Sequence, residues 1–222
     1  MPGTVRLSDV LKRLIDIWAA AAGLLVLSPI LAATAVALLV AQGRPILFRQ
    51  QRPGRGGVPF SIAKFRTMRV LRRGEVAYRT DELRVTTLGR VLRATSIDEL
   101  PELWNVIRGE MSLVGPRPLL MEYLATYTER QRRRHEVRPG VTSWAAVNGR
   151  HVLRFEERIE LDVWYVEHRS LRLDFRIIVM TIQQVLARTA VSAIQDPDAI
   201  GFPLPGPDAG ADPAPSPPGA PR

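Results

Sequence analysis

The sequence contains no cysteine, so disulfide bonds, thiolate metal ligands and a cysteine nucleophile are all excluded. Only two of its 31 basic residues are lysines. In a chain that otherwise uses arginine, Lys12 and Lys64 are retained either for a local role or by chance. No Gly-x-Gly-x-x-Gly or Walker loop is present, which leaves a dinucleotide cofactor and ATP hydrolysis without support. The net charge of +9 is typical of chains that bind nucleic acid, anionic membrane surfaces or phosphate-rich substrates.

Charge itself is missing from a long stretch, because no charged residue occurs between Ile17 and Ala41. At about 1.5 Å per residue a helix of this length exceeds the roughly 30 Å hydrocarbon core of a bilayer. Ser28-Pro29 lies near its midpoint, where proline removes a backbone hydrogen bond and the serine hydroxyl can bond a freed carbonyl. Basic residues flank both ends, as expected if both ends are cytoplasmic. A single transmembrane span, a re-entrant helix and a buried core helix all remain open.

The rest of the chain predicts a mainly helical α+β domain. Apolar runs at 45–48 and 58–62 around a glycine-rich segment are typical of a β-hairpin. The polar segment 72–86 is expected to be a loop and residues 138–140 a turn. Helices are expected at 88–92, 119–134, 155–168 and 171–188, the last with a broad apolar face that suits a core or a membrane interface.

Two adjacent acids, Asp98 and Glu99, stand at the predicted start of a further helix. Ser96 and Glu99 match a capping box, although Asp98 as the N-cap is an equally good register. A helix N-terminus favours ionised carboxylates, so capping alone explains most such pairs. In a functional interpretation the two acids have different roles: one binds metal or attacks an electrophile, and the other accepts or donates a proton.

Several basic residues are candidates for phosphate binding. Arg117 lies between two prolines that restrict its backbone, which suits bidentate phosphate binding or simply an exposed turn. Lys64 and Arg66 alternate with apolar residues at the end of the second strand and could face one polar site or a surface edge. Arg138 and Arg150 flank a segment that ends in an Asn-Gly turn signal.

Other polar residues receive ordinary interpretations. The three histidines, His135, His151 and His168, lack metal-ligand spacing and are expected at the surface or at an interface. Asp162 and Asp174 fall on predicted helices, where capping or ion pairing is the default. Basic residues are not interleaved with an aromatic platform, which weakens nucleic-acid binding.

Taken together, these segments resemble the bacterial sugar transferases, the monotopic polyprenyl-phosphate phosphoglycosyl transferases in their small form. The resemblance runs from about Lys12 to Arg188 and depends on the order and spacing of many short motifs. The motifs are 48–50 (Phe-Arg-Gln), 64–68 (Lys-Phe-Arg-Thr-Met), 84–90, 96–101 (Ser-Ile-Asp-Glu-Leu-Pro), 104–106, 111–118 (Met-Ser-Leu-Val-Gly-Pro-Arg-Pro), 138–142, 147–150 and 161–166.

The resemblance implies an activity. Such enzymes move a sugar-1-phosphate from a nucleotide-diphosphate sugar, usually a UDP-sugar, to a polyprenyl (undecaprenyl) phosphate acceptor. They release the nucleoside monophosphate, UMP for a UDP-sugar, need Mg²⁺ and start glycoconjugate assembly. The residue matching Asp98 is the nucleophile and a metal ligand, and Glu99 is its partner acid or base. Lys64, Arg117, Arg150 and Asp174 match further active-site positions.

The resemblance also implies an architecture. The Ser28-Pro29 break makes a re-entrant membrane helix in residues 1–43, followed by a catalytic domain at 44–190 and a proline-rich disordered tail at 191–222. Interfacial amphipathic helices and a small β-hairpin would surround an active site on the cytoplasmic face of the bacterial inner membrane. Membrane lipids are then partners and nucleic acid is not, while contact with downstream glycosyltransferases and a homo-oligomer stay open.

Two departures from the family pattern leave the sugar and nucleotide preference open. Ser143-Trp-Ala-Ala146 stands where relatives often have Gly-Trp-Ala-Gln, and His151 stands where asparagine is frequent. The rival hypotheses are a catalytically inactive membrane scaffold for glycan-assembly enzymes and, from charge alone, a membrane-tethered nucleic-acid-binding protein.

Overall fold

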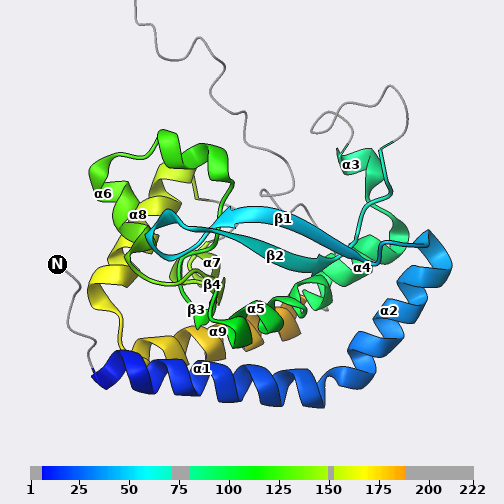
Figure 1. Ribbon diagram of the computed structural model, residues 1–222, viewed down its shortest axis with the longest axis horizontal. Coiled ribbons are helices and arrows are strands. Elements are labelled where there is room, and N and C mark those ends of the chain that lie inside the picture. Colours follow the sequence, from blue (N-terminus) through cyan, green and yellow to red (C-terminus); the bar gives the residue numbers. More distant parts are fainter. Residues whose placement is uncertain (1–6, 72–80, 150–152, 189–222) are drawn as a thin grey trace, which may run out of the picture.

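The structure, a computed structural model, describes residues 7–71, 81–149 and 153–188 and is mainly helical with two small sheets, which confirms the α+β class. Figure 1 shows the long helix α1 along one edge of the molecule and the β1–β2 hairpin above it. The helices are α1 Leu7–Val26, α2 Ser28–Gln42, α3 Asp81–Arg84, α4 Thr87–Ala94, α5 Glu102–Arg108, α6 Glu129–Arg132, α7 Trp144–Val147, α8 Phe155–His168 and α9 Leu171–Arg188. The strands are β1 Leu47–Pro53, β2 Pro59–Phe65, β3 Ser112–Val114 and β4 Gly140–Thr142.

The apolar segment forms two helices, α1 and α2, that are bent by 60° at the predicted break. Pro29 has no amide hydrogen to give to the carbonyl of Leu25, and the Ser28 hydroxyl donates to that carbonyl instead, at 2.7 Å. Within the described residues no single helix is long and apolar enough to cross a membrane, but this bent pair is, by length and composition. The Ser-Pro break is therefore real, and it fits a broken span or a re-entrant helix.

The outward faces of α1 and α2 carry large apolar side chains that nothing in the described chain covers. Trp18 is 74% exposed and Val40 is 83% exposed, and Leu25, Val26 and Val36 are exposed as well. This pattern contradicts the alternative of a buried core helix. Removing such side chains from water is worth roughly 25 cal/mol per Å² of apolar surface, so a hydrocarbon environment would stabilise these faces.

The inward face of α1 packs against α5, which in turn packs against β2. Ala20 is fully buried in this layer, and its small side chain lets the two helices approach closely. The remaining members of the cluster are Phe60, Ile62, Leu103, Val106 and Met111. A second core joins α8 and α9 to the β3–β4 pair through Val114, Tyr165 and Ile177.

The predicted hairpin is present and is longer than expected. β1 and β2 pair antiparallel over seven residues each, from Leu47 opposite Phe65 to Pro53 opposite Pro59. The side chain of Asn105 on α5 fastens the hairpin, because its amide donates to the Ser61 carbonyl at 2.8 Å and its oxygen accepts from the Ala63 amide at 3.2 Å. The hairpin therefore holds a fixed position relative to α5.

The turn predicted at residues 138–140 is wrong. The chain there is extended, and its continuation β4 pairs parallel with β3. Gly115 and Gly140 allow this close approach: a Cβ on Gly115 would lie 2.3 Å from the Arg138 carbonyl oxygen, and one on Gly140 would lie 2.1 Å from the Gly115 nitrogen. The Gly140 amide donates to the Pro116 carbonyl at 3.0 Å, which fixes the start of the Gly115–Pro118 segment.

Two other predictions need correction. The helix expected at 119–134 is divided into a 3₁₀ turn at Met121–Ala125, α6, and a 3₁₀ turn at Arg133–Glu136. Thr128 starts α6 with a capping box to Gln131, which ends the preceding turn. The loop expected at 72–86 includes α3 in its described part. The helices expected at 155–168 and 171–188 are confirmed, whereas the predicted tail lies outside the described residues.

Candidate active site

Asp98 and Glu99 lie on a short 3₁₀ turn, Ile97–Glu99, that precedes α5. Both predicted capping registers are wrong, since Ser96 makes no cap bond and α5 begins only at Glu102, after Pro101. Proline is well tolerated there because the first helical amides have no intrahelical partner. Ser96 adopts a left-handed conformation with φ of 56°, which redirects the chain just before the two acids. Asp98 is 8% exposed, so the acid nominated as nucleophile is nearly buried.

Glu99 is held by two cations from distant parts of the sequence. The Lys64 ammonium from β2 lies 2.9 Å from the Glu99 Oε1 atom, and the Arg117 guanidinium donates to the same oxygen. All three side chains are largely shielded from solvent. The structure thus brings together three of the predicted site residues, Glu99, Lys64 and Arg117, as one cluster that can bind an anionic phosphate group, and Asp98 adjoins Glu99 in the chain.

A third acid, Glu102, belongs to this cluster and was missed by the sequence analysis. Its Oε1 atom lies 3.3 Å from the Lys64 ammonium, and the residue is 2% exposed. Burial raises the pKa of Glu102 to about 7, with Lys64 acting in the opposite direction. The sequence feature that could have identified Glu102 is its spacing. Glu102 follows Glu99 by three residues, and this spacing places two side chains on one face of a helix.

Arg117 is supported from behind by a buried ion pair. The Arg134 guanidinium donates to the Arg117 carbonyl at 2.6 Å and to the Asp162 carboxylate on α8, also at 2.6 Å. The side chains of Arg134 and Asp162 are each 1% exposed. Arg134 also donates to the Tyr127 hydroxyl at 3.0 Å. The ion-pair interpretation of Asp162 is confirmed, and its partner anchors the segment that carries Arg117.

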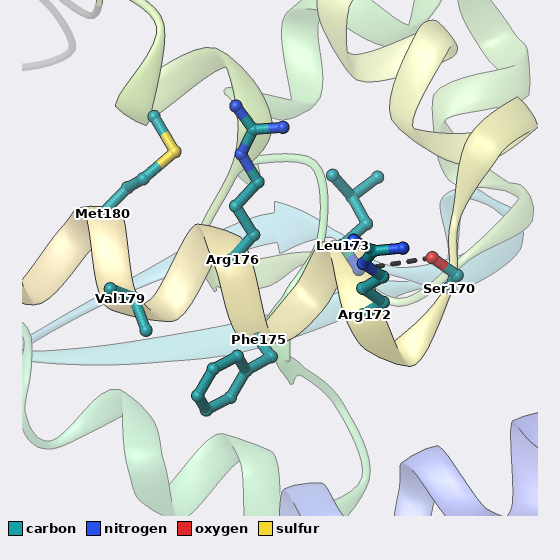
Figure 2. Close-up of a pocket in the computed structure, with 7 residues that line it drawn as sticks. All are labelled: Ser170, Arg172, Leu173, Phe175, Arg176, Val179 and Met180. Carbon is teal, nitrogen blue, oxygen red and sulfur yellow. Dashed lines mark hydrogen bonds between the residues drawn. The ribbon is translucent and has the colours of Figure 1, made fainter.

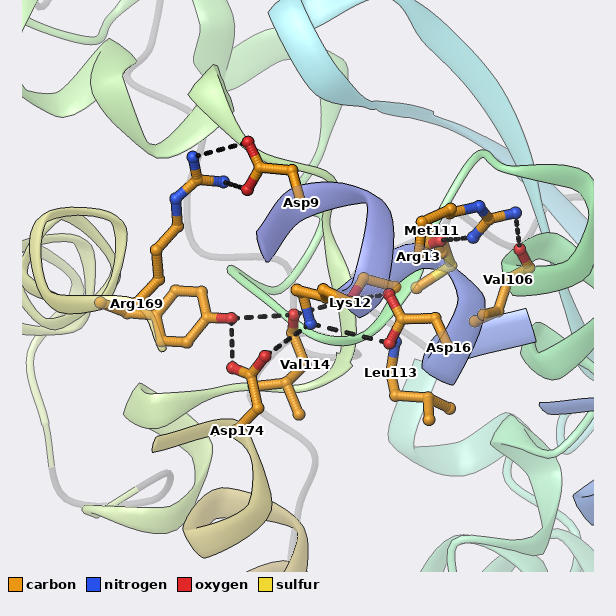
Figure 3. A network of polar contacts seen from close by, with 12 residues as sticks. Asp9, Lys12, Arg13, Asp16, Val106, Met111, Leu113, Val114, Arg169 and Asp174 are labelled. Atoms are coloured by element: carbon orange, nitrogen blue, oxygen red, sulfur yellow. Dashed lines mark hydrogen bonds and ion pairs between the residues drawn. The ribbon is translucent and has the colours of Figure 1, made fainter. Parts of the chain in front are cut away.

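Asp174 is placed in a different network, which joins α9 to α1 (Figure 3). Its carboxylate accepts from the Lys12 ammonium at 2.8 Å and from the Tyr165 hydroxyl at 2.6 Å. Lys12 also lies 3.6 Å from Asp16, whose carboxylate accepts from the Ser112 hydroxyl on β3 at 2.8 Å. This network fixes the amino-terminal half of α1 against the strand that leads to Arg117.

Three other residues that were predicted to bind substrate or phosphate are not seen among the contacts of Glu99, Lys64 and Arg117. The Arg66 guanidinium donates to the carbonyls of Gln42 and Gly43 at 2.6 and 2.9 Å and so closes the end of α2. The expectation that Lys64 and Arg66 face one site is wrong, because β2 ends at Phe65 and strand alternation stops there. Arg138 donates to the Gly109 carbonyl at 2.9 Å, and burial lowers its pKa. Arg150 lies outside the described residues.

Comparison with known proteins shows which family this chain belongs to. Residues 7–188 match the model of the bacterial sugar transferase family. The chain belongs to that family. This confirms the resemblance read from the motifs around Asp98 and Arg117.

Three relatives show how far the similarity extends. The chain is 48% identical over 182 residues to the uncharacterized sugar transferase EpsL of Bacillus subtilis, covering 82% of this chain and 90% of that protein. It is 42% identical over 189 residues to the UDP-glucose:undecaprenyl-phosphate glucose-1-phosphate transferase of Caulobacter vibrioides, covering 80% and 70% of the two chains. The Escherichia coli protein of the same name is 38% identical over 182 residues, covering 78% of this chain and 39% of that protein.

The donor set of this sugar transferase fits Mg²⁺ but not a closed metal cage. Among the described residues no group of three or more His, Asp or Glu side chains is arranged to hold a metal ion. Mg²⁺ is commonly held by one or two carboxylates together with substrate phosphates and water. Asp98, next to Glu99 in the chain, provides one such hard oxygen donor.

A separate hollow of about 610 Å³ lies along α9 (Figure 2). None of its lining residues belongs to the acidic cluster, so it is distinct from the candidate active site. The lining residues are Ser170, Arg172, Leu173, Phe175, Arg176, Val179 and Met180.

The histidines are only partly as expected. His135 is buried, so the surface or interface prediction is wrong for it, and burial lowers its pKa to about 4. His168 is exposed and stacks on Trp164 with ring centroids 4.4 Å apart. His151 lies outside the described residues.

Proposed function

We propose that this sugar transferase moves a sugar-1-phosphate from a UDP-sugar to undecaprenyl phosphate and releases UMP. The observation that carries the proposal is the cluster in which Asp98 lies beside Glu99, with Lys64 and Arg117 bound to the same Glu99 oxygen. Two of the relatives named above are UDP-glucose:undecaprenyl-phosphate glucose-1-phosphate transferases, which supports both substrate classes.

In the first step an Asp98 carboxylate oxygen attacks the β-phosphorus of the donor. A bond forms between that oxygen and phosphorus, the bond from phosphorus to the bridging oxygen breaks, and UMP leaves with the electron pair. The product is a phosphosugar bound covalently to Asp98. Lys64 and Arg117 are near enough to one another to neutralise the charge that grows on the phosphate oxygens.

In the second step an oxygen of the lipid phosphate attacks the same phosphorus atom. The bond to Asp98 breaks, the carboxylate is regenerated and a polyprenyl diphosphate sugar is formed. Glu99 is the partner acid or base of these steps, held in position by its two cations. A covalent intermediate lets one site use a soluble donor and a lipid acceptor in turn.

Asp98 would hold Mg²⁺ together with the phosphates of the donor, and the ion would neutralise phosphate charge during transfer. The nearly buried position of Asp98 supports this role, because a carboxylate shielded from water interacts more strongly with a cation.

The bent α1–α2 pair supports a location at the bacterial inner membrane. Its exposed apolar faces and the basic residues on both flanks fit a re-entrant helix whose two ends are cytoplasmic. In that arrangement the active site lies on the cytoplasmic face, where UDP-sugars are available and the lipid phosphate lies at the membrane surface.

The direct test is to trap the intermediate. We expect the wild-type protein mixed with its UDP-sugar, without acceptor, to gain the mass of one phosphosugar at Asp98 and to release one equivalent of UMP. Asp98→Asn should lose both the adduct and turnover while it still inserts into membranes. Asp9→Asn, which changes an exposed ion pair with Arg169, serves as the matched control. Full turnover in Asp98→Asn would refute the proposal.

A further inference from the structure

Lys64 lies between two carboxylates that differ in their other partners. Glu99 also binds Arg117, so it retains a cation if Lys64 moves. For Glu102, Lys64 is the one cation within ion-pair distance in the described part of the chain. Glu102 is also the more deeply buried of the two acids. The two acids therefore respond differently to anything that draws the ammonium away.

A buried carboxylate without a cation is costly, because the protein interior solvates charge far less well than water does. Such a group usually takes up a proton instead of remaining ionised. The Oε1 atom of Glu102 makes no hydrogen bond in the described structure, although it lies 3.3 Å from the Lys64 nitrogen. The ionised form of the Glu102 side chain thus depends chiefly on the charge of Lys64, with a smaller contribution from Arg117.

A phosphate group is the natural competitor for Lys64. The lysine side chain is 20% exposed, so an incoming anion can reach it, and Arg117 binds the same Glu99 oxygen. We propose that Glu102 is a positioning residue which holds Lys64 before the donor binds and takes up one proton from solvent when a donor phosphate engages Lys64. The proton forms an O–H bond at the Glu102 carboxylate, and Lys64 keeps its own proton. This inference rests on the proposed function, because it needs phosphate at this cluster.

The electrostatics of the cluster support this exchange. Burial raises the pKa of Glu102 to about 7; Lys64 on β2 and Arg117 on the Gly115–Pro118 segment lower it, while Glu99 raises it. An added anion near Lys64 raises it further. Above the titration midpoint Glu102 is therefore ionised in the free protein and becomes protonated in the phosphate complex.

The first experiment needs no ligand. We expect infrared difference spectra of the full chain in lipid nanodiscs to show a protonated-carboxyl band that titrates near pH 7. Glu102→Gln should lose this band, whereas the exposed control Glu156→Gln should keep it. Lys64→Met should shift the midpoint upward, because it removes the cation that opposes protonation; a purely structural role for Glu102 predicts no such shift. Identical spectra for wild type and Glu102→Gln, or an unmoved midpoint in Lys64→Met, would overturn the inference.

The second experiment measures the proton directly. UDP-glucose and UDP are titrated calorimetrically into the wild-type protein with Mg²⁺, above the midpoint, in buffers of different ionisation enthalpy. We expect net proton uptake on binding in the wild type and loss of that uptake in Glu102→Gln, with binding retained. Equal uptake in both proteins would overturn the role of Glu102 and leave the proposed function intact. Failure of the wild type to bind either nucleotide would overturn both.

Discussion

At the scale of single residues, Glu99 and Glu102 differ in the number of cations that they bind. A single Glu99 oxygen binds both Lys64 and Arg117, which fixes both cations. In the described part of the chain, Glu102 has one cation within ion-pair distance, Lys64 at 3.3 Å, and burial raises the pKa of Glu102. Neighbouring carboxyls in different environments are a common way for one site to contain groups of different protonation.

Removing divalent metal should stop turnover, because Lys64 and Arg117 alone leave the charge of the donor diphosphate and the Asp98 carboxylate incompletely neutralised. We expect UMP release to fall to background in excess EDTA and to recover when Mg²⁺ is added back. The lysine and arginine should still retain some nucleotide binding under these conditions. Unchanged UMP release in EDTA would argue against any role of the metal.

His135 should make folding stability sensitive to acid. Its pKa is lowered from 6.5 to about 4, chiefly by burial and then by Arg134. Between these values the unfolded chain binds a proton that the folded chain does not, so stability falls as pH drops through this window. We expect His135→Phe to lose less thermal stability than the wild type between pH 6.5 and 4, with exposed His168→Phe as control. Parallel losses in all three proteins would contradict this.

At the scale of elements, the bend between α1 and α2 sets a 60° angle between the two apolar helices. The Ser28 hydroxyl bonds the carbonyl that Pro29 leaves without an amide partner, so the bend is stabilised and not merely permitted. Arg66 closes the far end of α2 by bonding the Gln42 and Gly43 carbonyls. Both ends of α2 are thus defined by side chains, which fixes where the chain leaves the helix pair.

Replacing the break should change the topology of the chain. We expect the double variant Ser28→Ala, Pro29→Leu to favour a continuous helix, because it restores the backbone donor and removes the competing hydroxyl. A part of the population should then place its amino terminus on the opposite side of the membrane. The chain has no cysteine of its own, so Thr4→Cys and Arg49→Cys can report sidedness by labelling with an impermeant maleimide in cells. Identical labelling with and without the break would refute this role.

At the scale of the whole molecule, buried polar networks join segments that are distant in sequence. Lys12 and Asp174 connect α1 to α9, and Asp16 connects α1 to β3. Arg134 connects α8, through Asp162, to the backbone of Arg117. The position of the Arg117 guanidinium therefore depends on helices that contribute no group to the acidic cluster.

Variants of the Arg134–Asp162 pair can separate its effect on folding stability from its effect on the position of Arg117. Arg134→Met removes the buried guanidinium that neutralises the Asp162 carboxylate and should cost roughly 3–5 kcal/mol of stability. The double variant Arg134→Met, Asp162→Leu should recover most of that loss, since an apolar pair replaces the ions. We expect its kcat to stay at least about tenfold below wild type, which corresponds to about 1.4 kcal/mol, because the Arg117 carbonyl has lost its donor. Wild-type kcat in a stable double variant would show that Arg134 does not position Arg117.

Local signals were sufficient for several parts of this protein. The Ser28-Pro29 break, the hairpin and the helices 155–168 and 171–188 follow from periodicity, turn residues and proline chemistry, which act over a few neighbouring residues. The helix predicted at 119–134 failed because a local capping box at Thr128 interrupts an amphipathic pattern that looked continuous. The extended chain at 138–140 was missed because its partner β3 lies 28 residues earlier.

The sequence by itself determined the family, the bent apolar helix and the identity of the acids and cations, because these depend on residue type and order. Tertiary structure alone decided that Lys64, Glu99, Glu102 and Arg117 share one cluster, while Arg66 closes a helix and Asp174 binds Lys12. The reason is physical: charge pairing and burial depend on distances through space, and those are set by how α1, α5, β2 and α9 pack together.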